Sequence, residues 1–312
     1  MVCRKIKQKA KDLGFDLLGI TSAEPIDAGK IEHFKNWLAA GNNGKMAWLQ
    51  NNIEKRFNPA LLMPDAKSVI CAAINYKPAQ SSSIVASYAL YQDYHTFIKQ
   101  KLLELAEFIK KEIDKNLKSK ICVDSTPLAE RSLAIRAGLG FIGKNHLLAN
   151  PHIGSFLLLG ELITNLPLKP DTPLEQKDYC KNCNKCLDAC PAGVISKNGF
   201  FDARKCVSYL TIEHKGRIPK TLKPKISHIF GCDACIKACP YNSKAPVCQN
   251  KDFKFFAKRQ NLTAKEVLQW SKRDFDAVFA DSAVSRTGLR QLKRNALICS
   301  KNKTYGCAET IF

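Results

Sequence analysis

The hydrophobic pattern of the first half of the chain alternates between the periods of strands and of helices. Residues 15–21 (FDLLGIT) and 67–76 (KSVICAAINY) are apolar, β-branched runs typical of buried strands. Helices are expected over 4–13 and 27–41. A longer helix is predicted over 94–117, where apolar residues recur at helical spacing: Ile98, Leu102, Leu105, Ile109 and Ile113.

Two more strands and one helix are predicted before residue 165. The strands are KICVD (120–124) and GSFLLLGELIT (154–164), and the helix between them is PLAERSLAIRAG (127–138), with Pro at its start and Gly at its end. Alternating strands and helices pack as layers around one core. We therefore predict an α/β or α+β fold, with a layered domain over residues 1–170.

The pattern changes at the Pro-rich segment LPLKPDTPLEQKD (166–178). Beyond it the chain is rich in Cys and poor in long apolar segments up to about Cys248, as expected where metal clusters replace a hydrophobic core. A helical pattern returns over 263–300. We therefore predict a ferredoxin-like domain over 171–250 and a short helical region over 251–312.

Composition indicates the cellular compartment of the protein and the kind of chemistry that its cysteines perform. The basic start MVCRKIKQKAK is not followed by an apolar segment, and no run approaches about 18 apolar residues. We therefore expect a cytoplasmic protein with no membrane partner, and we expect it to be a monomer. Its 14 Cys residues then indicate metal or redox chemistry, because the cytosol keeps thiols reduced.

Seven of the cysteines fall in two compact motifs that each end in Pro. The first, CKNCNKCLDACP, has the spacing of bacterial ferredoxins, in which the fourth Cys ligates the other cluster of a pair. The second, CDACIKACP, has one Cys fewer, so a distant Cys is needed. Counting ligands predicts two 4Fe-4S clusters, the first held by Cys180, Cys183, Cys186 and Cys239 and the second by Cys190, Cys206, Cys232 and Cys235.

A zinc site is the alternative for these motifs, since zinc also binds Cys pairs. Four Cys within 11 residues are, however, too crowded for one tetrahedral ion. Two adjacent clusters conduct single electrons, so they imply an external donor and an acceptor that the motifs do not identify. The remaining cysteines lack ligand spacing and are expected to be buried thiols: Cys3, Cys71, Cys122, Cys248, Cys299 and Cys307.

The segment AGLGFIGKN (137–145) fits the dinucleotide-binding pattern G-x-G-x-x-G. That fingerprint requires a strand before the first glycine and a helix after the last. Here a predicted helix runs into Gly138, which makes Gly138 a helix C-terminal residue. No acidic residue closes a following strand, because Glu161 lies inside one. The pattern therefore indicates a turn, and dinucleotide binding is not expected.

Several longer segments resemble the epoxyqueuosine reductase family of tRNA-modifying enzymes. The resemblance covers nearly the whole chain and rests on residues 124–165 with the two Cys motifs, on KRFNPALLMPDAKSVI (55–70), on YALYQDYH (88–95) and on CVSYLTIEHKGRIP (206–219). It implies a corrinoid, cob(II)alamin, held by the first domain, which the clusters reduce to a strongly nucleophilic state. It also implies reduction of epoxyqueuosine to queuosine at the wobble position of a tRNA with a GUN anticodon. The external donor would be a low-potential carrier of the ferredoxin or flavodoxin type.

The resemblance implies a set of corrinoid contacts. Ser208 and Asp233 lie beside cluster ligands, and Lys144 and Asn145 follow the glycine turn. The segment DYHTFI begins like the cobalamin motif D-x-H-x-x-G but has Ile98 in place of Gly, so His95 is expected to be structural or a polar contact. The full set is Arg56, Tyr88, Asp93, Tyr94, Asp124, Lys144, Asn145, Ser208 and Asp233.

Asp124 is the predicted proton donor, a role that the resemblance also implies. It ends the strand 120–124, where a side chain projects into a cleft. A carboxylic acid whose pKa is raised in an apolar pocket can protonate the oxygen that leaves when an epoxide opens. The alternative is that Asp124 or Ser125 caps the helix predicted at 127. If Asp124 is catalytic, Ser125 or Thr126 can serve as the cap.

The basic charge is concentrated in the last third of the chain. Residues 200–312 carry 22 Lys and Arg against 9 Asp and Glu, within a net charge of +21 for the whole sequence. HKGRIPKTLKPK (214–225) contains no acid, and RTGLRQLKRN (286–295) spaces its cations as one helix face. Such surfaces bind phosphates, although a solvated helix face is the alternative. The predicted tRNA contacts are Lys215, Arg217, Lys220, Arg286, Arg290, Lys293 and Arg294.

Two other functions are compatible with these motifs. A corrinoid-dependent reductive dehalogenase would be expected to carry an export signal and to lack the basic last third. A two-cluster electron carrier would use the first domain only for docking and would bind no cobalamin. The reductase of epoxyqueuosine in tRNA is the function that the sequence favours.

Overall fold

The computed structural model describes residues 1–82, 84–196 and 199–302, and its centre is a four-stranded sheet in the order β1-β2-β6-β3. All neighbouring strands are antiparallel, so the fold is α+β. The apolar runs identified in the sequence form its strands: β1 (Leu17–Ser22), β2 (Ser68–Asn75), β3 (Ser119–Cys122) and β6 (Leu157–Thr164).

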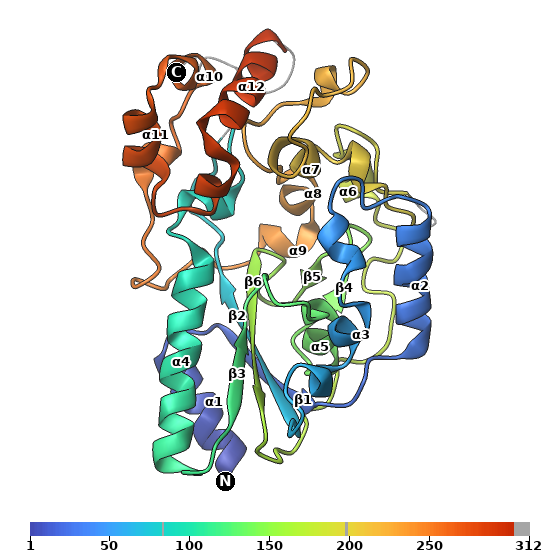
Figure 1. Cartoon of the computed structure of the whole chain (residues 1–312), viewed down its shortest axis with the longest axis vertical. Coiled ribbons are helices and arrows are strands. Elements are labelled where there is room, and N and C mark those ends of the chain that lie inside the picture. Colours follow the sequence, from blue (N-terminus) through green and yellow to red (C-terminus); the bar gives the residue numbers. More distant parts are fainter. Residues whose placement is uncertain (83, 197–198, 303–312) are drawn as a thin grey trace.

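Helices cover both faces of this sheet (Figure 1). Successive side chains of β2 point to opposite faces, so Ile70 and Ile74 pack toward α1 (Val2–Asp12) and α4 (Tyr94–Glu112). The alternate residues of β2 belong to a second cluster, which includes residues of α5 (Glu130–Arg136). Because both faces are covered, every residue of β2 is buried.

The last three helices and most of the cysteine-containing segment form the upper part of the molecule in Figure 1, next to one end of the sheet. Short elements carry the cysteine motifs, and α2 (Ala28–Ala39) and α3 (Ile53–Phe57) lie to the right of the sheet. The elements not yet named are β4 (Phe141–Ile142), β5 (Leu148–Ala149), α6 (Lys185–Asp188), α7 (Val207–Ile212), α8 (Ala234–Lys237), α9 (Pro240–Ser243), α10 (Ala264–Gln269), α11 (Lys272–Phe279) and α12 (Gly288–Lys301).

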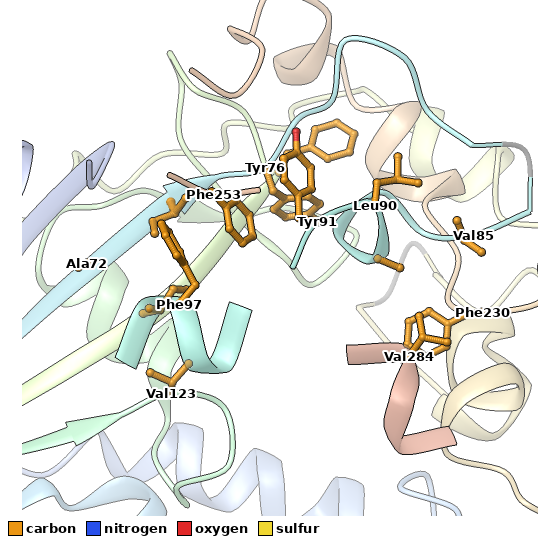
Figure 2. Packing of buried hydrophobic residues seen from close by; sticks show 14 of the residues in the cluster. Ala72, Tyr76, Val85, Leu90, Tyr91, Phe97, Val123, Phe230, Phe253 and Val284 are labelled. Carbon is orange, nitrogen blue, oxygen red and sulfur yellow. The ribbon is translucent and has the colours of Figure 1, made fainter. Parts of the chain in front are cut away.

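The largest hydrophobic cluster joins the first domain to the last helices. Figure 2 shows Tyr91, Phe97 and Phe253 side by side. The rings of Tyr91 and Phe253 are stacked with centroids 4.7 Å apart, and those of Phe97 and Phe253 are 4.8 Å apart. The same cluster runs from Ile6 to Cys299. It therefore continues across the domain boundaries expected at residues 170 and 250, and the division into three domains remains a prediction.

Arg259 fastens the C-terminal helices to the segment before α4. It is 1% exposed, and its guanidinium donates to the carbonyl oxygens of Ala89, Tyr91, Val278 and Asp281 at 2.5–3.2 Å. Burial lowers the pKa of Arg259 to about 10, which leaves it charged at neutral pH. Charged donors make the stronger hydrogen bonds.

Replacing Arg259 with Met is expected to lower the free energy of unfolding by at least about 2 kcal/mol, because buried carbonyl oxygens would lose their donors. Chemical denaturation with the cofactors bound would measure it. Exposed Arg273 on α11 is the matched control, and its replacement by Met should leave stability unchanged. Equal stability of the two variants would contradict this role for Arg259.

Every strand and helix predicted before residue 165 is present, with shifted bounds. The helix predicted at 127 begins at Glu130 instead. The preceding segment forms tight turns, in which the Ser125 N–H donates to the Val123 carbonyl oxygen (2.5 Å) and the Leu128 N–H donates to that of Thr126 (2.7 Å). The helical pattern over 263–300 divides into three helices. No helix in the described ranges has the length and apolarity to cross a membrane.

Candidate active site and cluster-binding segment

Asp124 lies in the loop between β3 and α5. Its backbone has a positive φ of 53°, which is uncommon for a residue with a side chain. The Glu130 carboxylate accepts a hydrogen bond from the Asp124 N–H at 2.7 Å, and this bond holds the loop in place. The helix after the loop has Ala129 as its N-cap and no side-chain cap. The alternative role of Asp124 as a helix cap is therefore wrong.

His95, at the start of α4, pairs with the Asp124 side chain. Its Nε2 lies 3.1 Å from Asp124 Oδ2, and its Nδ1 lies 2.7 Å from Asp93 Oδ1. Burial alone would lower the pKa of His95, but hydrogen bonds to Asp124 and Asp93, together with their charges, raise it to about 9. His95 is therefore protonated at neutral pH and donates to both carboxylates.

The pKa of Asp124 differs from the prediction. We expected an apolar pocket to raise it, but the hydrogen bond from His95 lowers it, and the charges of His95 and Arg286 add to this effect. The Asp124 side chain is also 59% exposed. At neutral pH the structure therefore places a carboxylate at position 124 and the adjacent proton on His95.

Two buried carboxyl groups lie behind this loop. Glu161 is fully buried in β6, between Cys71 and Cys122 on the neighbouring strands. Burial raises the pKa of both Glu161 and Glu130, and the charge of Glu130 raises that of Glu161 further. Because two neighbouring carboxyl groups in such a site cannot both be ionised, the pair retains a proton. It supports the Asp124 loop from inside the fold.

Asp124 opens into a cavity of about 320 Å³. Arg286 lines it and forms an ion pair with Glu213 at 2.5 Å. Arg56 also lines it, and the buried Nε of Arg56 has no hydrogen-bond partner among the described residues. Trp48, Asn51 and Asn52 also line the cavity. The cavity therefore combines cations and amides with one acid and one aromatic ring.

Three predicted corrinoid contacts, Tyr88, Tyr94 and Asp233, lie near the Asp124–His95 pair. The ring of Tyr88 is 6.1 Å from that of Tyr94, and burial raises the pKa of both hydroxyl groups. The charges of Asp124 and Asp233 both act on Tyr88. Asp233 is 1% exposed and accepts a hydrogen bond from the Ser87 N–H at 2.5 Å. These residues thus connect the Asp124–His95 pair to the second Cys motif.

Lys144 and Asn145 contact the segments that carry the Cys motifs. The Lys144 ammonium donates to the carbonyl oxygens of Lys181 (2.7 Å) and Cys183 (3.1 Å). Asn145 is buried and its amide donates to the carbonyl oxygen of Cys235 at 3.5 Å. Both residues therefore contact the backbone of the Cys motifs, and Asp93 likewise is used as the N-cap of α4.

The glycine turn before Lys144 agrees with the sequence analysis. Gly138 has φ of 79° and follows the end of α5, and its N–H donates to the Ile135 carbonyl oxygen. A Cβ added at Gly140 would lie 2.3 Å from the carbonyl oxygen of Ala149. These glycines end a helix and allow β4 and β5 to approach, as predicted.

The seven motif cysteines and Cys206 form two sets of four. Burial raises the pKa of Cys186, and the thiols that raise it further are Cys180, Cys183 and Cys239. In the other set, burial raises the pKa of Cys235, with further contributions from Cys232, Cys206 and Cys190. Each set contains thiols from separate loops, which is what the four corners of a 4Fe-4S cluster require. No three His, Cys, Asp or Glu side chains in the described ranges could hold a single metal ion.

Ser208 and the other cysteines complete the Cys-containing segment. Burial raises the pKa of the half-buried Cys206 thiol, and hydrogen bonds from the backbone N–H groups of Tyr209 and Ser208 oppose this shift. Outside the two sets, Cys71, Cys122 and Cys299 are buried as predicted. Cys3 and Cys248 are half-buried instead, because they lie at the edge of the largest cluster. Cys307 lies outside the described residues.

The structure separates the predicted tRNA contacts into two groups. Lys215, Arg217, Lys220 and Arg290 are exposed. The expectation of one helix face is wrong for Arg286, which precedes α12 and lines the cavity. Arg294 does lie on α12, one turn after Arg290, but it is half-buried and its guanidinium donates to the carbonyl oxygens of Leu210, His214 and Gly216. Lys293 is half-buried.

Sequence reasoning missed the roles of His95, Glu130 and Glu161. The signal for His95 was its place two residues after an N-cap acid, in DYH, but the partner Asp124 is 29 residues away. Glu161 had a signal too, since an acid inside an apolar strand is seldom buried without a partner. Nothing in the sequence pairs it with Glu130.

The chemistry of these side chains fits the expected cofactors. Two sets of four thiols match two clusters. The unpartnered Arg56 Nε and the cavity amides fit the amide-bearing rim of a corrinoid or the polar edge of a nucleoside.

Comparisons with known proteins show the family of this chain. The family model for epoxyqueuosine reductase QueG, DUF1730, matches residues 56–125, and a 4Fe-4S double cluster binding domain matches residues 179–242. An epoxyqueuosine reductase from Cyclobacterium marinum is 40% identical over 299 residues, covering 93% of this chain and 94% of that protein.

Solved structures of epoxyqueuosine reductases are also similar to this chain. An epoxyqueuosine reductase crystallised with a tRNA-Tyr epoxyqueuosine-modified stem loop has a TM-score of 0.88 and 31% identity, covering 96% of this chain and 81% of that one. The Bacillus subtilis enzyme, with its catalytic aspartate loop swung out of the active site, has a TM-score of 0.87, 30% identity and the same coverage.

The dehalogenase alternative is not supported by similarity of this kind. The catabolic reductive dehalogenase NpRdhA has a TM-score of 0.50 and 18% identity, covering 95% of this chain and 37% of that one, which shows the fold alone. The double-cluster domain also favours iron–sulfur clusters over zinc. By identity and coverage, the chain belongs to the epoxyqueuosine reductase family, and it contains the double-cluster iron–sulfur domain.

Proposed function

We propose that this chain reduces the epoxide of epoxyqueuosine at the wobble position of a tRNA with a GUN anticodon. The observation that carries the proposal is the pairing of Asp124 with His95 at the mouth of a cavity. Family membership supports it. The protein would work in the cytoplasm as a monomer and would receive electrons from a ferredoxin or flavodoxin type of carrier.

The cofactor ligands follow from the two sets of thiols and the residues beside them. Cys180, Cys183, Cys186 and Cys239 would hold one cluster, and Cys190, Cys206, Cys232 and Cys235 the other. Arg56, Tyr88, Tyr94, Ser208 and Asp233 would hold the corrinoid. When bound, the clusters supply single electrons and the corrinoid supplies a low-potential centre for breaking the C–O bond.

Asp124 and His95 would supply protons. Opening the epoxide and releasing its oxygen as water, with an alkene left behind, consumes two electrons and two protons. His95 holds a proton 3.1 Å from Asp124, and Asp124 passes it to the developing oxygen anion. Because the Asp124 side chain is 59% exposed, water can return protons to the pair.

Turnover is expected to fall as the pH rises through about 9, because His95 loses its proton there. Its folded pKa lies above the unfolded value near 6.5. The contribution of the pair to stability is therefore complete below about pH 6.5 and is lost as the pH rises through about 9. Replacing His95 with Gln should lower kcat by about 10²-fold at pH 7 and remove this alkaline limb. An unchanged pH–rate profile in the variant would exclude His95 as the proton source.

Arg290 and Arg294 form a matched pair for testing tRNA binding by the exposed cations. Replacing exposed Arg290 with Gln should weaken tRNA binding and reduce the slope of log K against log salt by about 0.9 if one phosphate contact is lost. Replacing Arg294 with Gln should instead lower the melting temperature, because backbone carbonyls lose their donor. Binding titrations between 50 and 200 mM salt measure the first effect. Identical slopes for wild type and the Arg290 variant would remove Arg290 from the tRNA surface.

Mass spectrometry of nucleosides tests the function itself. Protein with both clusters reconstituted is incubated with cobalamin, a low-potential reductant and tRNA that contains epoxyqueuosine. Conversion to queuosine is expected. Unchanged epoxyqueuosine with cobalamin bound would exclude this substrate, and a failure to bind cobalamin would favour the two-cluster electron carrier.

A further inference from the structure

Trp48 is an exposed aromatic residue at the rim of the cavity that contains Asp124. Its side chain is 53% exposed, and it lies in the 3-10 turn Ala47–Gln50. The other two Trp residues are placed differently. Trp37 donates from its indole N–H to the Phe201 carbonyl oxygen at 2.7 Å, and Trp270 is 7% exposed. Trp48 thus presents an apolar face to solvent beside the reacting groups.

The turn that carries Trp48 is fixed to the cluster-binding segment. The Tyr209 hydroxyl accepts a hydrogen bond from the Lys45 N–H at 2.8 Å, and the Asn42 carbonyl oxygen accepts one from the Ala203 N–H at 3.1 Å. A Cβ added at Gly44 would lie 2.4 Å from the Tyr209 hydroxyl oxygen, so this contact requires glycine. The exposure of Trp48 is therefore a property of a well-anchored turn.

The surroundings of Trp48 identify the kind of group that would cover it. The cavity wall supplies amides from Asn51 and Asn52 and cations from Arg56 and Arg286. Amides pair with the edges of bases, cations pair with phosphates, and an aromatic ring stacks on a base. A volume of about 320 Å³ lies near the lower end of the range for small-molecule sites, about 300–1,000 Å³, which suits a single nucleoside.

We propose that Trp48 stacks on a nucleobase of the substrate RNA next to the modified nucleoside, while that nucleoside enters the cavity toward Asp124. The inference rests on the proposed function. An RNA loop that delivers one nucleoside into a pocket leaves the neighbouring bases unstacked, and a protein aromatic ring replaces the lost stacking. Trp48 is a binding residue in this scheme and takes no part in proton or electron transfer.

A double-mutant cycle tests this contact with the protein in its cofactor-loaded form. The probe is an anticodon stem loop with epoxyqueuosine, made also with an abasic nucleotide on the 5′ or the 3′ side of the modified nucleoside. Replacing Trp48 with Ala should weaken RNA binding by about 5- to 140-fold, the effect of one base stack. One abasic RNA should lose a similar amount with wild-type protein and should lose nothing further with the Trp48→Ala variant.

Two controls separate stacking from general damage. Trp48→Phe keeps a ring and should retain most of the affinity, while Leu61→Ala removes another exposed apolar side chain, 49% exposed, and should change nothing. If the affinity loss from Trp48→Ala and the loss from each abasic RNA simply add, the inference is wrong. Unchanged RNA affinity of the Trp48→Ala variant would also overturn it. Since wild-type turnover of the intact stem loop is measured in parallel, a failure of the proposed function would be visible separately.

Discussion

Replacing Asp124 with Asn is expected to lower the rate of epoxide reduction by about 10²–10⁴-fold, the usual contribution of a positioned general acid. Asn keeps the size of the side chain and can still accept a hydrogen bond from His95 Nε2, which lies 3.1 Å away in the wild type. It cannot carry a proton to the substrate. The positive φ of Asp124 is tolerated by Asn, which adopts this conformation more readily than most residues.

Single-turnover kinetics with loaded enzyme would measure this loss. Both clusters and the cobalamin should stay bound, as seen in the ultraviolet-visible spectrum, because Asp124 lies outside the two sets of thiols. Asp65, which is exposed and pairs with Lys118 at 2.6 Å, is the matched control, and its replacement by Asn should leave the rate unchanged. A variant at Asp124 that reduces epoxyqueuosine at the wild-type rate would show that the proton comes from elsewhere.

Replacing Cys206 with Ala is expected to remove one whole cluster, so that iron falls from about eight to about four atoms per chain. Cys206 supplies the one thiol of its set that lies outside both motifs. Burial raises the pKa of the Cys206 and Cys232 thiols, with a further contribution from Cys190 to Cys206 and from Cys206 to Cys232. With three thiolates left, the cubane loses one iron ligand in a buried site, and electron transfer to the active site should stop.

Iron quantitation and electron paramagnetic resonance of the reduced protein would follow this loss. Cys3 provides the control, because it is half-buried at the edge of the largest cluster and lies in neither set. Its replacement by Ala should leave about eight iron atoms. Retention of about eight atoms after the Cys206 change would assign the fourth ligand to another residue.

The sequence by itself determined the features that depend on neighbours along the chain. Strands β2 and β6 could be predicted because apolar runs buried on both faces need no polar alternation. The spacing from Cys180 to Cys190 predicts cluster binding because one tight loop must present several thiolates together. Gly138 could be recognised as the end of a helix because few other residues adopt its φ of 79° without strain.

Only the tertiary structure decided which distant groups meet. Asp124 and His95 are 29 residues apart and form a pair only because the start of α4 and the loop after β3 meet at the same end of the sheet. That contact reverses the expected pKa shift of Asp124. Arg290 and Arg294 are one helical turn apart, yet one is exposed and the other holds carbonyl oxygens of α7 and its following loop. Burial and charge pairing depend on packing between segments that no local pattern links.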